Sequence, residues 1–358
     1  MIYIHVPFCK SFCTYCDFFS EIPQEGMFEA YTKQLCQEIK SRSREIDSGL
    51  NTLYFGGGTP SVLPLSNLTR ILLALEECGH GGPYTEFTME VNPEDLVEKG
   101  LPYLQSLRTL GVNRISIGIQ SLDDELLRWM NRRHNAEHAV KAVKLAREAG
   151  FENVSVDLIF GLSNLKDEVW ERTIDDVLEL KPEHISCYQL TVEGDSVLAH
   201  RLETGEYEEA TEEQCARQYN TLCHILHAAG YNHYEISNFA MPGFEAKHNG
   251  GYWQRRPYVG LGPSAHSFSG RCRSWNSDDL DGYTHTEESL SVEDEKVETL
   301  MLGLRTSRGV DAEFLEANCL MADIQRLIAQ GALVKSGRRY HIPENHFFVS
   351  DQIIRELI

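Results

Sequence analysis

Short apolar runs alternate along most of this chain with longer segments whose apolar residues recur every three or four positions. The short runs predict strands, at residues 2–6, 52–55, 87–91, 114–119, 154–160 and 184–190. The longer segments predict helices, at residues 27–46, 65–77, 94–107, 123–130, 136–150 and 168–180. Strands that alternate with helices of this length indicate βαβ units and a parallel sheet. We therefore predict an α/β fold, an incomplete (β/α)6-type barrel whose site lies at the carboxyl ends of the strands.

The pattern changes after residue 273. Residues 274–294 are rich in Asp, Ser, Glu and Thr, which is typical of a loop or linker. Helical spacing returns at 297–305 and 314–330, and residues 333–342 predict a hairpin. The predicted domains are a barrel over 1–273, a linker over 274–294 and a small, mostly helical, winged-helix-like domain over 295–358.

Composition narrows the function classes. A chain of 358 residues with 42% hydrophobic content can bury a large core, and at about 150 residues per domain it predicts two domains. The formal net charge of −21 argues against nucleic acid and anionic lipid as partners. The few basic residues of the C-terminal hairpin favour packing or partner docking over DNA binding. No apolar run approaches the roughly 18 residues of a membrane span, and no secretory signal is visible.

Three of the ten cysteines, Cys9, Cys13 and Cys16, are spaced C-x3-C-x2-C directly after the first predicted strand. The other seven are scattered singly, as expected of reduced core residues, which predicts a cytoplasmic protein. Thiolates suit iron–sulfur clusters, and three of them hold three irons of a four-iron cube and leave the fourth iron open. Three alternatives stand beside this interpretation: a structural zinc site, for which no second ligand pair follows, a disulfide, and a chance group of core cysteines.

Polar residues and glycines gather where the predicted strands end. Gly56–Gly58 follow the second strand, Glu90 and Asn92 the third and Gln120 the fourth, and Asp157 lies within the fifth. Glycine lets a backbone approach a ligand closely, although a glycine triplet is more often a turn. Each polar residue alone is as often a cap or a satisfied core group. Their shared position favours one common ligand.

These motifs together resemble a known family. The run from Tyr3 to Cys16, G-G-G-T-P-S at 56–61, E-x-N-P at 90–93, S-x-G-x-Q-S at 116–121 and D-L-I-x-G at 157–161 look like the oxygen-independent coproporphyrinogen III oxidase-like branch of the radical S-adenosylmethionine (SAM) superfamily. The resemblance implies a [4Fe-4S] cluster on Cys9, Cys13 and Cys16, with SAM on the open iron. It implies SAM contacts from Tyr3, Tyr15, Gly57 and Glu90. Five further residues match positions that bind a second SAM in the oxidase: Gly58, Thr59, Gln120, Arg132 and Asp157.

Two departures from the oxidase favour the HemW-type haem chaperones of this branch. Phe18 stands where the oxidase has a fourth cysteine, and the oxidase's N-terminal extension has no counterpart in this sequence. Residues 248–253 match H-N-x-x-Y-W, which the resemblance assigns to haem binding through His248, Asn249, Tyr252 and Trp253. A neutral imidazole suits haem iron, and aromatic rings suit a porphyrin edge. Without the family, a histidine near aromatic residues is more often a packed one, and the axial ligand stays open.

Two function classes remain. In the first, the protein carries haem to a haem-accepting protein, and the cluster and SAM govern structure, dimerisation or release. In the second, it is a radical enzyme that oxidises porphyrinogen propionates. This class keeps support because the full SAM-binding set is present. We favour the haem chaperone, for which SAM cleavage stays open. The resemblance implies an electron donor such as flavodoxin or ferredoxin and allows a homodimer.

Overall fold

The computed structural model describes residues 1–46, 51–194, 196–280 and 282–358. Its centre is a nine-stranded sheet in which β1 to β6 are parallel neighbours in chain order. β9 adds in parallel beside β1, and β8 and β7 close the other edge in antiparallel pairing. The strands are β1 (Ile2–Val6), β2 (Thr52–Gly57), β3 (Glu86–Val91), β4 (Arg114–Gln120), β5 (Val154–Phe160), β6 (His184–Gln189), β7 (Asn232–Glu235), β8 (Asn238–Ala240) and β9 (Val259–Leu261).

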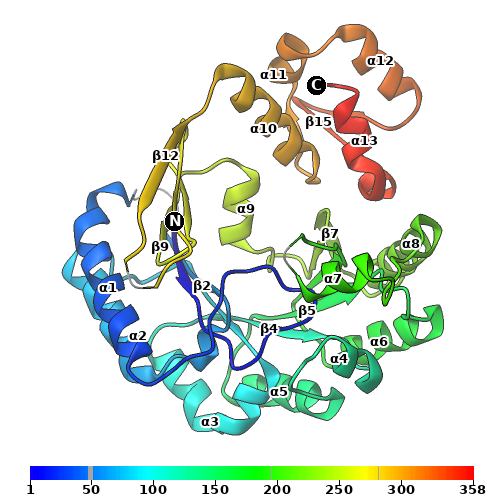
Figure 1. Cartoon of the computed structure of the whole chain (residues 1–358). Coiled ribbons are helices and arrows are strands. Elements are labelled where there is room, and N and C mark those ends of the chain that lie inside the picture. Colours follow the sequence, from blue (N-terminus) through cyan, green and yellow to red (C-terminus); the bar gives the residue numbers. More distant parts are fainter. Residues whose placement is uncertain (47–50, 195, 281) are drawn as a thin grey trace.

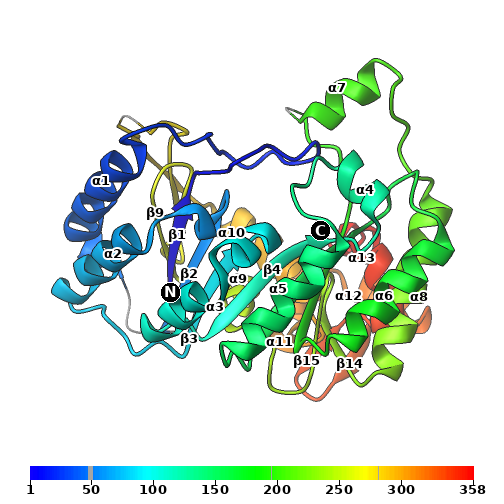
Figure 2. The ribbon, with the colours of Figure 1, turned by 90° about the horizontal axis from the view of Figure 1, so that it is seen from below.

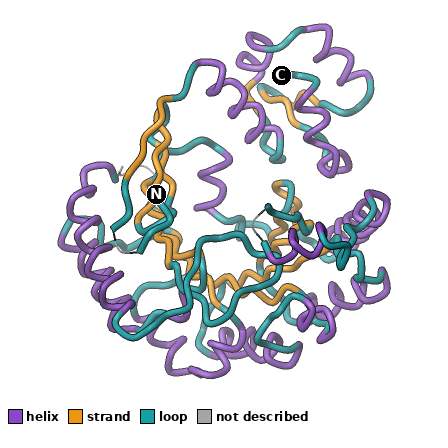
Figure 3. Tube along the Cα trace, in the orientation of Figure 1, coloured by secondary structure: helices purple, strands orange, loops and turns teal. Residues whose placement is uncertain are grey.

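Helices cover the convex side of this curved sheet, as Figures 1 and 3 show. They are α1 (Met27–Arg42), α2 (Leu65–Glu77), α3 (Pro93–Thr109), α4 (Asp124–Trp129), α5 (Ala136–Glu148), α6 (Asp167–Glu179) and α8 (Glu212–Ala228), with short 3₁₀ turns at Ser43–Glu45 and Pro60–Val62. The alternation predicted from the hydrophobic pattern is confirmed, and with it the partial barrel.

The two faces of the strands differ in chemistry, because successive side chains of a strand point to opposite faces. The apolar positions form the core under the helices, for example Ile4, Phe55 and Ile117, which are fully buried. The register places inward polar positions beside one another: Glu90 pairs with Ser116, and Gly118 with Asp157. The concave side of the sheet is therefore a polar interior rather than a second hydrophobic core.

Residues 190–273 contain elements that the hydrophobic pattern did not predict. Besides α8 and β7 to β9, they form α7 (Val197–Glu203), α9 (Lys247–Trp253) and β10 (His266–Phe268). Most of these elements are three to seven residues long, too short for a periodicity to be recognised.

The prediction of a linker over 274–294 is wrong where the chain forms strands. β11 (Cys272–Asn276) extends into this range and β12 (His285–Ser289) lies within it, and the two pair antiparallel, with β10 on the other side of β11. β12 is exposed along its whole length, which is why its composition resembles that of a loop. Asp281, also in this range, lies outside the described residues.

The C-terminal part consists of α10 (Val292–Leu304), α11 (Ala312–Asn318), α12 (Met321–Ala329) and α13 (Ser350–Arg355), with a 3₁₀ segment at Glu344–Val349. β13 (Val310–Asp311), β14 (Val334–Ser336) and β15 (Arg339–His341) form its small sheet. The helix predicted at 314–330 is two helices, separated at Cys319 and Leu320. No helix in the described part of the chain is long and apolar enough to span a membrane.

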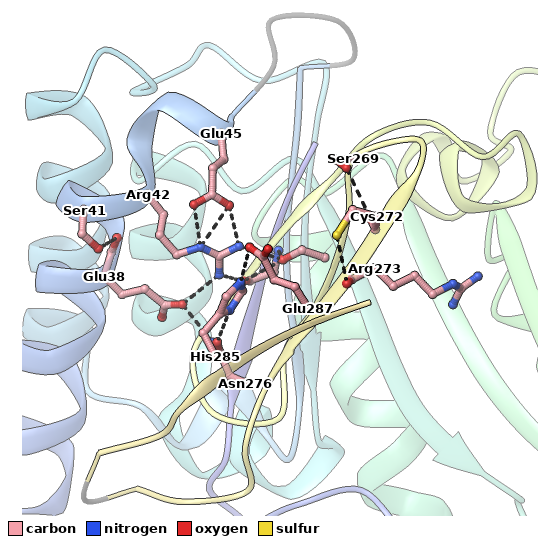
Figure 4. A network of polar contacts seen from close by, with 12 residues as sticks. Glu38, Ser41, Arg42, Glu45, Ser269, Cys272, Arg273, Asn276, His285 and Glu287 are labelled. Carbon is pink, nitrogen blue, oxygen red and sulfur yellow. Dashed lines mark hydrogen bonds and ion pairs between the residues drawn. The ribbon is translucent and has the colours of Figure 1, made fainter. Parts of the chain in front are cut away.

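A buried arginine fastens the β10–β12 sheet to the barrel (Figure 4). Arg42, at the end of α1, forms ion pairs with Glu38 at 3.0 Å and Glu45 at 2.7 Å. Its guanidinium also donates to the Gly260 carbonyl at 2.9 Å and to Ser267 Oγ at 3.0 Å. Glu38 accepts from the amide of Asn276 on β11 at 2.8 Å. One charged cluster therefore holds helix, barrel edge and hairpin together.

We expect Arg42→Met to lower the free energy of unfolding by about 3 kcal/mol, because it leaves a largely buried carboxylate and two acceptors without their donor. Chemical denaturation measures the loss. Lys40→Met is the matched control: its pair with Glu77 is exposed and screened by solvent, so its loss should change the free energy of unfolding little. Equal effects of the two changes would contradict the anchoring role of Arg42.

Candidate functional site

A cavity of about 840 Å³ opens at the carboxyl ends of the parallel strands. Most residues that the sequence singled out line it, although they come from segments far apart in the chain. They are Cys9, Cys13, Tyr15, Cys16, Gly57, Gly58, Thr59, Glu90, Gln120, Arg132, Asp157 and Asn249. Tyr3, His248, Tyr252 and Trp253 do not line it.

The cysteines lie on the segment between β1 and α1, which crosses the end of the sheet toward α4 and α7 (Figure 2). Its two ends are held together at the base. The backbone amide of Cys9 donates to the Glu21 carbonyl at 3.0 Å, and the Glu21 amide donates to the Pro7 carbonyl at 2.7 Å. His5 Nε2 lies 2.9 Å from the Phe19 carbonyl. The segment is thus a closed loop with a fixed base.

The tip of the loop is held by the far side of the barrel. The Thr14 amide donates to the Met130 carbonyl at 3.2 Å, and the Leu198 amide at the start of α7 donates to the Thr14 carbonyl at 2.8 Å. The Asn131 side chain donates to the Phe12 carbonyl at 2.7 Å. Asn131 has a positive φ of 57°, so it ends α4 in a turn that faces the loop. Asn131 therefore helps to position the cysteine loop.

Polar side chains connect two of the thiols through the strand ends. Cys9 Sγ lies 3.3 Å from Thr59 Oγ1, and Asn92 donates to that hydroxyl at 3.2 Å. Arg132 donates to Asn92 Oδ1 at 2.8 Å and to Cys13 Sγ at 3.3 Å. Arg132 also donates to the Gly118 carbonyl at 2.7 Å. This network gives each of these two sulfurs a polar partner.

The glycine triplet packs β2 against the base of the cysteine loop. The Gly58 amide donates to the Val6 carbonyl at 2.9 Å, and a Cβ on Gly58 would lie 2.9 Å from backbone atoms of Val6 and Phe8. Gly57 has a φ of 103°, and a Cβ there would meet the His5 ring at 2.7 Å. The triplet is required for this close approach of two backbones.

The donor set fits an iron–sulfur cluster. Three thiols from one loop face one cavity, and burial raises the pKa of Cys9 and brings that of Cys16 to about 11. In the described ranges no group of three or more His, Cys, Asp or Glu side chains converges on a single ion. Convergence is not needed, because each thiolate of such a set binds a different iron.

The floor of the cavity is the polar interior of the barrel. Tyr54 donates to Glu90 at 2.6 Å, and Ser116 donates to Asp157 at 3.1 Å. Burial raises the pKa of Glu90 to about 7, an effect that the nearby Asp157 carboxylate reinforces. Burial likewise raises the pKa of Asp157, against the attraction of Arg114. A cationic ligand group placed beside them would lower both pKa values and so favour the ionised carboxylates.

Sequence reasoning missed Arg114 as a lining residue of this cavity. It is 2% exposed, and its Nε has no hydrogen-bond partner among the described residues. A signal was available: arginine begins the otherwise apolar pattern of β4, at the inward-facing alternate position.

The H-N-x-x-Y-W motif forms helix α9, and its residues lie in different environments. His248 is fully buried: Nδ1 lies 2.8 Å from Thr52 Oγ1, and Nε2 lies 2.8 Å from the Tyr252 hydroxyl. Burial lowers the pKa of His248 to about 3, so the ring is neutral. Asn249 faces the cysteine-lined cavity, whereas Tyr252, together with Tyr3, lines a second cavity. Trp253 lines neither cavity. With both ring nitrogens engaged, His248 acts here as a packing residue between α9 and β2.

Comparisons with known proteins agree with this architecture. Residues 3–177 match the model of the radical SAM superfamily. The chain is 34% identical to the haem chaperone HemW of Lactococcus lactis, over 99% of this chain and 96% of that protein. It is 35% identical to HemW of Bacillus subtilis, over 86% and 84%.

Among solved structures, the radical SAM enzyme coproporphyrinogen III oxidase (HemN) of Escherichia coli superposes with a TM-score of 0.82 at 22% identity, covering 99% of this chain and 89% of that one. At that identity the match establishes the fold alone. The family inferred from the sequence motifs is confirmed by the relatives that match end to end. The chain belongs to the HemW family, within the radical SAM superfamily.

Proposed function

We propose that this protein is a haem chaperone, which binds haem and transfers it to a haem-accepting protein. The observation that carries the proposal is the end-to-end similarity to a protein named as a haem chaperone, which covers α9 and the C-terminal part as well as the barrel. Phe18 supports it: it is 66% exposed and lines the cysteine-lined cavity where a fourth thiol would be needed for the oxidase pattern.

Cys9, Cys13 and Cys16 would hold the [4Fe-4S] cluster, with SAM on its open iron beside Tyr15, Gly57 and Glu90. Bound there, cluster and SAM together supply one-electron chemistry. The chain's own contribution is positional. Arg132 and Thr59 hold two of the sulfurs in place, and the Glu90 carboxylate is in the cavity to pair with the ammonium group of SAM.

A second candidate is a coproporphyrinogen-type oxidase. One observation favours it: the residues matched to a second SAM site, Gly58, Thr59, Gln120, Arg132 and Asp157, all line the same cavity. Because Gly58, Thr59 and Arg132 also position the cysteine loop, Gln120 and Asp157 are the members of this set that support the oxidase.

Anaerobic titration of the reconstituted protein with haemin, followed at the Soret band, tests the chaperone. We expect saturable binding near one haem per chain and no decarboxylation of coproporphyrinogen III with SAM and a reductant. Porphyrinogen turnover without saturable haem binding would replace the chaperone with the oxidase.

The partners follow from the function. We propose a haem-accepting protein as the physiological target, an electron donor such as flavodoxin or ferredoxin for the cluster, and a homodimer as the assembly. Size-exclusion chromatography with light scattering measures the last of these, and twice the mass of one chain is the expected result.

We expect SAM affinity to rise with pH below about 7. Burial raises the pKa of Glu90 to about 7, so below that pH the carboxyl is protonated and cannot pair with the ammonium group. The dissociation constant should fall by up to tenfold per pH unit and level off above pH 7. Equilibrium dialysis of SAM against the reconstituted protein measures it. Glu90→Gln should bind weakly with no such slope, and a slope that survives in this variant would assign it to another group.

A further inference from the structure

A second cavity, of about 400 Å³, lies beside the cysteine-lined one, between α9, the turn that follows it, the β10–β11 hairpin and α10. Its volume is in the range of small-molecule sites. Phe18 lines both cavities, so the second is adjacent to the cysteine loop. The residues that define its chemistry are Tyr252, Arg255, Arg256, Tyr258, His266, Phe268, Arg273 and Glu298.

The cavity is cationic in a strongly anionic chain. Three arginines line it against one carboxylate, Glu298. Arg255 pairs with Glu298 at 3.2 Å and Arg273 pairs with it at 2.7 Å. Arg256 is exposed and forms no ion pair with any described residue. These lining residues carry a formal charge of about +2, which suits a ligand with two carboxylates.

Aromatic rings form the apolar part of the wall. The Tyr252 and Tyr258 ring centroids are 4.6 Å apart at an interplanar angle of 73°, and the Arg255 guanidinium lies over the Phe268 ring at 5.1 Å. Such a wall suits a flat, largely apolar ligand. A planar apolar body with two carboxylates is the chemistry of a porphyrin that bears propionates.

Three histidines lie near this site, and they differ in whether a metal could reach them. His248 has both ring nitrogens engaged, and so has His5, which lies 3.1 Å from the Tyr3 hydroxyl and 2.9 Å from the Phe19 carbonyl. His266 lines the cavity and is exposed, and no described residue hydrogen-bonds its ring. Its ring faces Trp275 across the β10–β11 pair, with centroids 6.1 Å apart and planes at 23°.

We propose that this second cavity is the haem site, with His266 as the axial ligand and the arginines as partners of the propionates. The proposal rests on the proposed haem-carrier function and names the place where haem binds. His266 and Arg273 lie on the hairpin that Arg42 anchors, and Glu298 comes from α10, so haem would contact both the barrel and the C-terminal part. Tyr252 contributes a wall of the cavity, which gives the H-N-x-x-Y-W helix a role without iron ligation by His248.

Anaerobic haemin titrations of four variants of the reconstituted full chain test the site. We expect His266→Ala to bind at least tenfold more weakly with a shifted Soret maximum, and added imidazole to restore the maximum. His248→Ala should lose thermal stability but keep the Soret position. Arg256→Gln should weaken haemin binding three- to tenfold and leave binding of haemin dimethyl ester unchanged. Arg338→Gln, an exposed arginine on the C-terminal hairpin, is the matched control for lost charge and should bind as the parent does.

A shifted Soret maximum in His248→Ala, with parental behaviour of His266→Ala, would overturn the proposed site but not the chaperone function. Equal effects of Arg256→Gln and Arg338→Gln would overturn the role of the arginines. A parent protein that shows no saturable haemin binding would overturn the chaperone as well, so the two failures are distinguishable.

Discussion

Cys13→Ser is expected to abolish the absorbance at about 400 nm of the reconstituted protein and, with it, any cleavage of SAM. A serine hydroxyl is a far weaker iron ligand than a thiolate, and two thiolates do not hold a four-iron cube. The substitution also removes the sulfur that accepts a hydrogen bond from Arg132. Absorbance, iron content and 5'-deoxyadenosine release after reduction measure the effect.

Cys319→Ser is the matched control, because Cys319 lies in the C-terminal part, between α11 and α12, and is half-buried like Cys13. It should keep parental iron content and absorbance. An unchanged spectrum in Cys13→Ser, or an equal loss in both variants, would contradict the assignment of the cluster to the loop.

Gly58→Ala is expected to lower iron incorporation at least tenfold although it changes no ligand. Its Cβ would lie 2.9 Å from the Val6 carbonyl oxygen and from backbone atoms of Phe8, directly before Cys9. Backbone atoms at this point cannot give way without moving the loop base, and overpacking of this kind costs about 1–3 kcal/mol. Iron content after anaerobic reconstitution measures the effect, and thermal unfolding separates it from loss of the fold.

Gly194→Ala provides the comparison for this change. Gly194 is exposed, and a Cβ there would have no heavy atom within 4 Å. It should reconstitute as the parent does. If Gly58→Ala also retained full iron content, the glycine triplet would not be needed for close packing against the loop, and its backbone would be free to serve a ligand directly.

The hydrophobic pattern predicted the first half of the fold well because each unit there is long and regular. A buried parallel strand followed by helical segments repeats five times before the sixth strand, and both periods are visible in the residues themselves. The prediction deteriorated from residue 190 onward. There the strands are two to five residues long, and β12 is exposed on both faces, so its composition resembles that of a linker.

The cysteine loop and the strand-end residues show how much of the site local sequence motifs can predict. Cys9, Cys13 and Cys16 are close in sequence, and Thr59, Glu90 and Asp157 follow or end strands, so a parallel barrel brings them to one rim. Their place around one cavity was predictable from topology. The contacts among them were not: Thr59 and Arg132 each contact one sulfur directly and are linked to each other by Asn92, a relation between four segments.

The sequence by itself determined the family, the barrel and the set of residues at its rim, because these depend on local spacing and on strand order. Only the tertiary structure decided which of these side chains are free to bind a ligand. A histidine in a motif looks the same whether its ring is free or held, but His248 is enclosed by Thr52 and Tyr252, whereas His266 is exposed beside three arginines. That difference arises from the packing of α9 on β2 and of the β10–β11 hairpin on α10, contacts between residues far apart in the chain that no local pattern encodes.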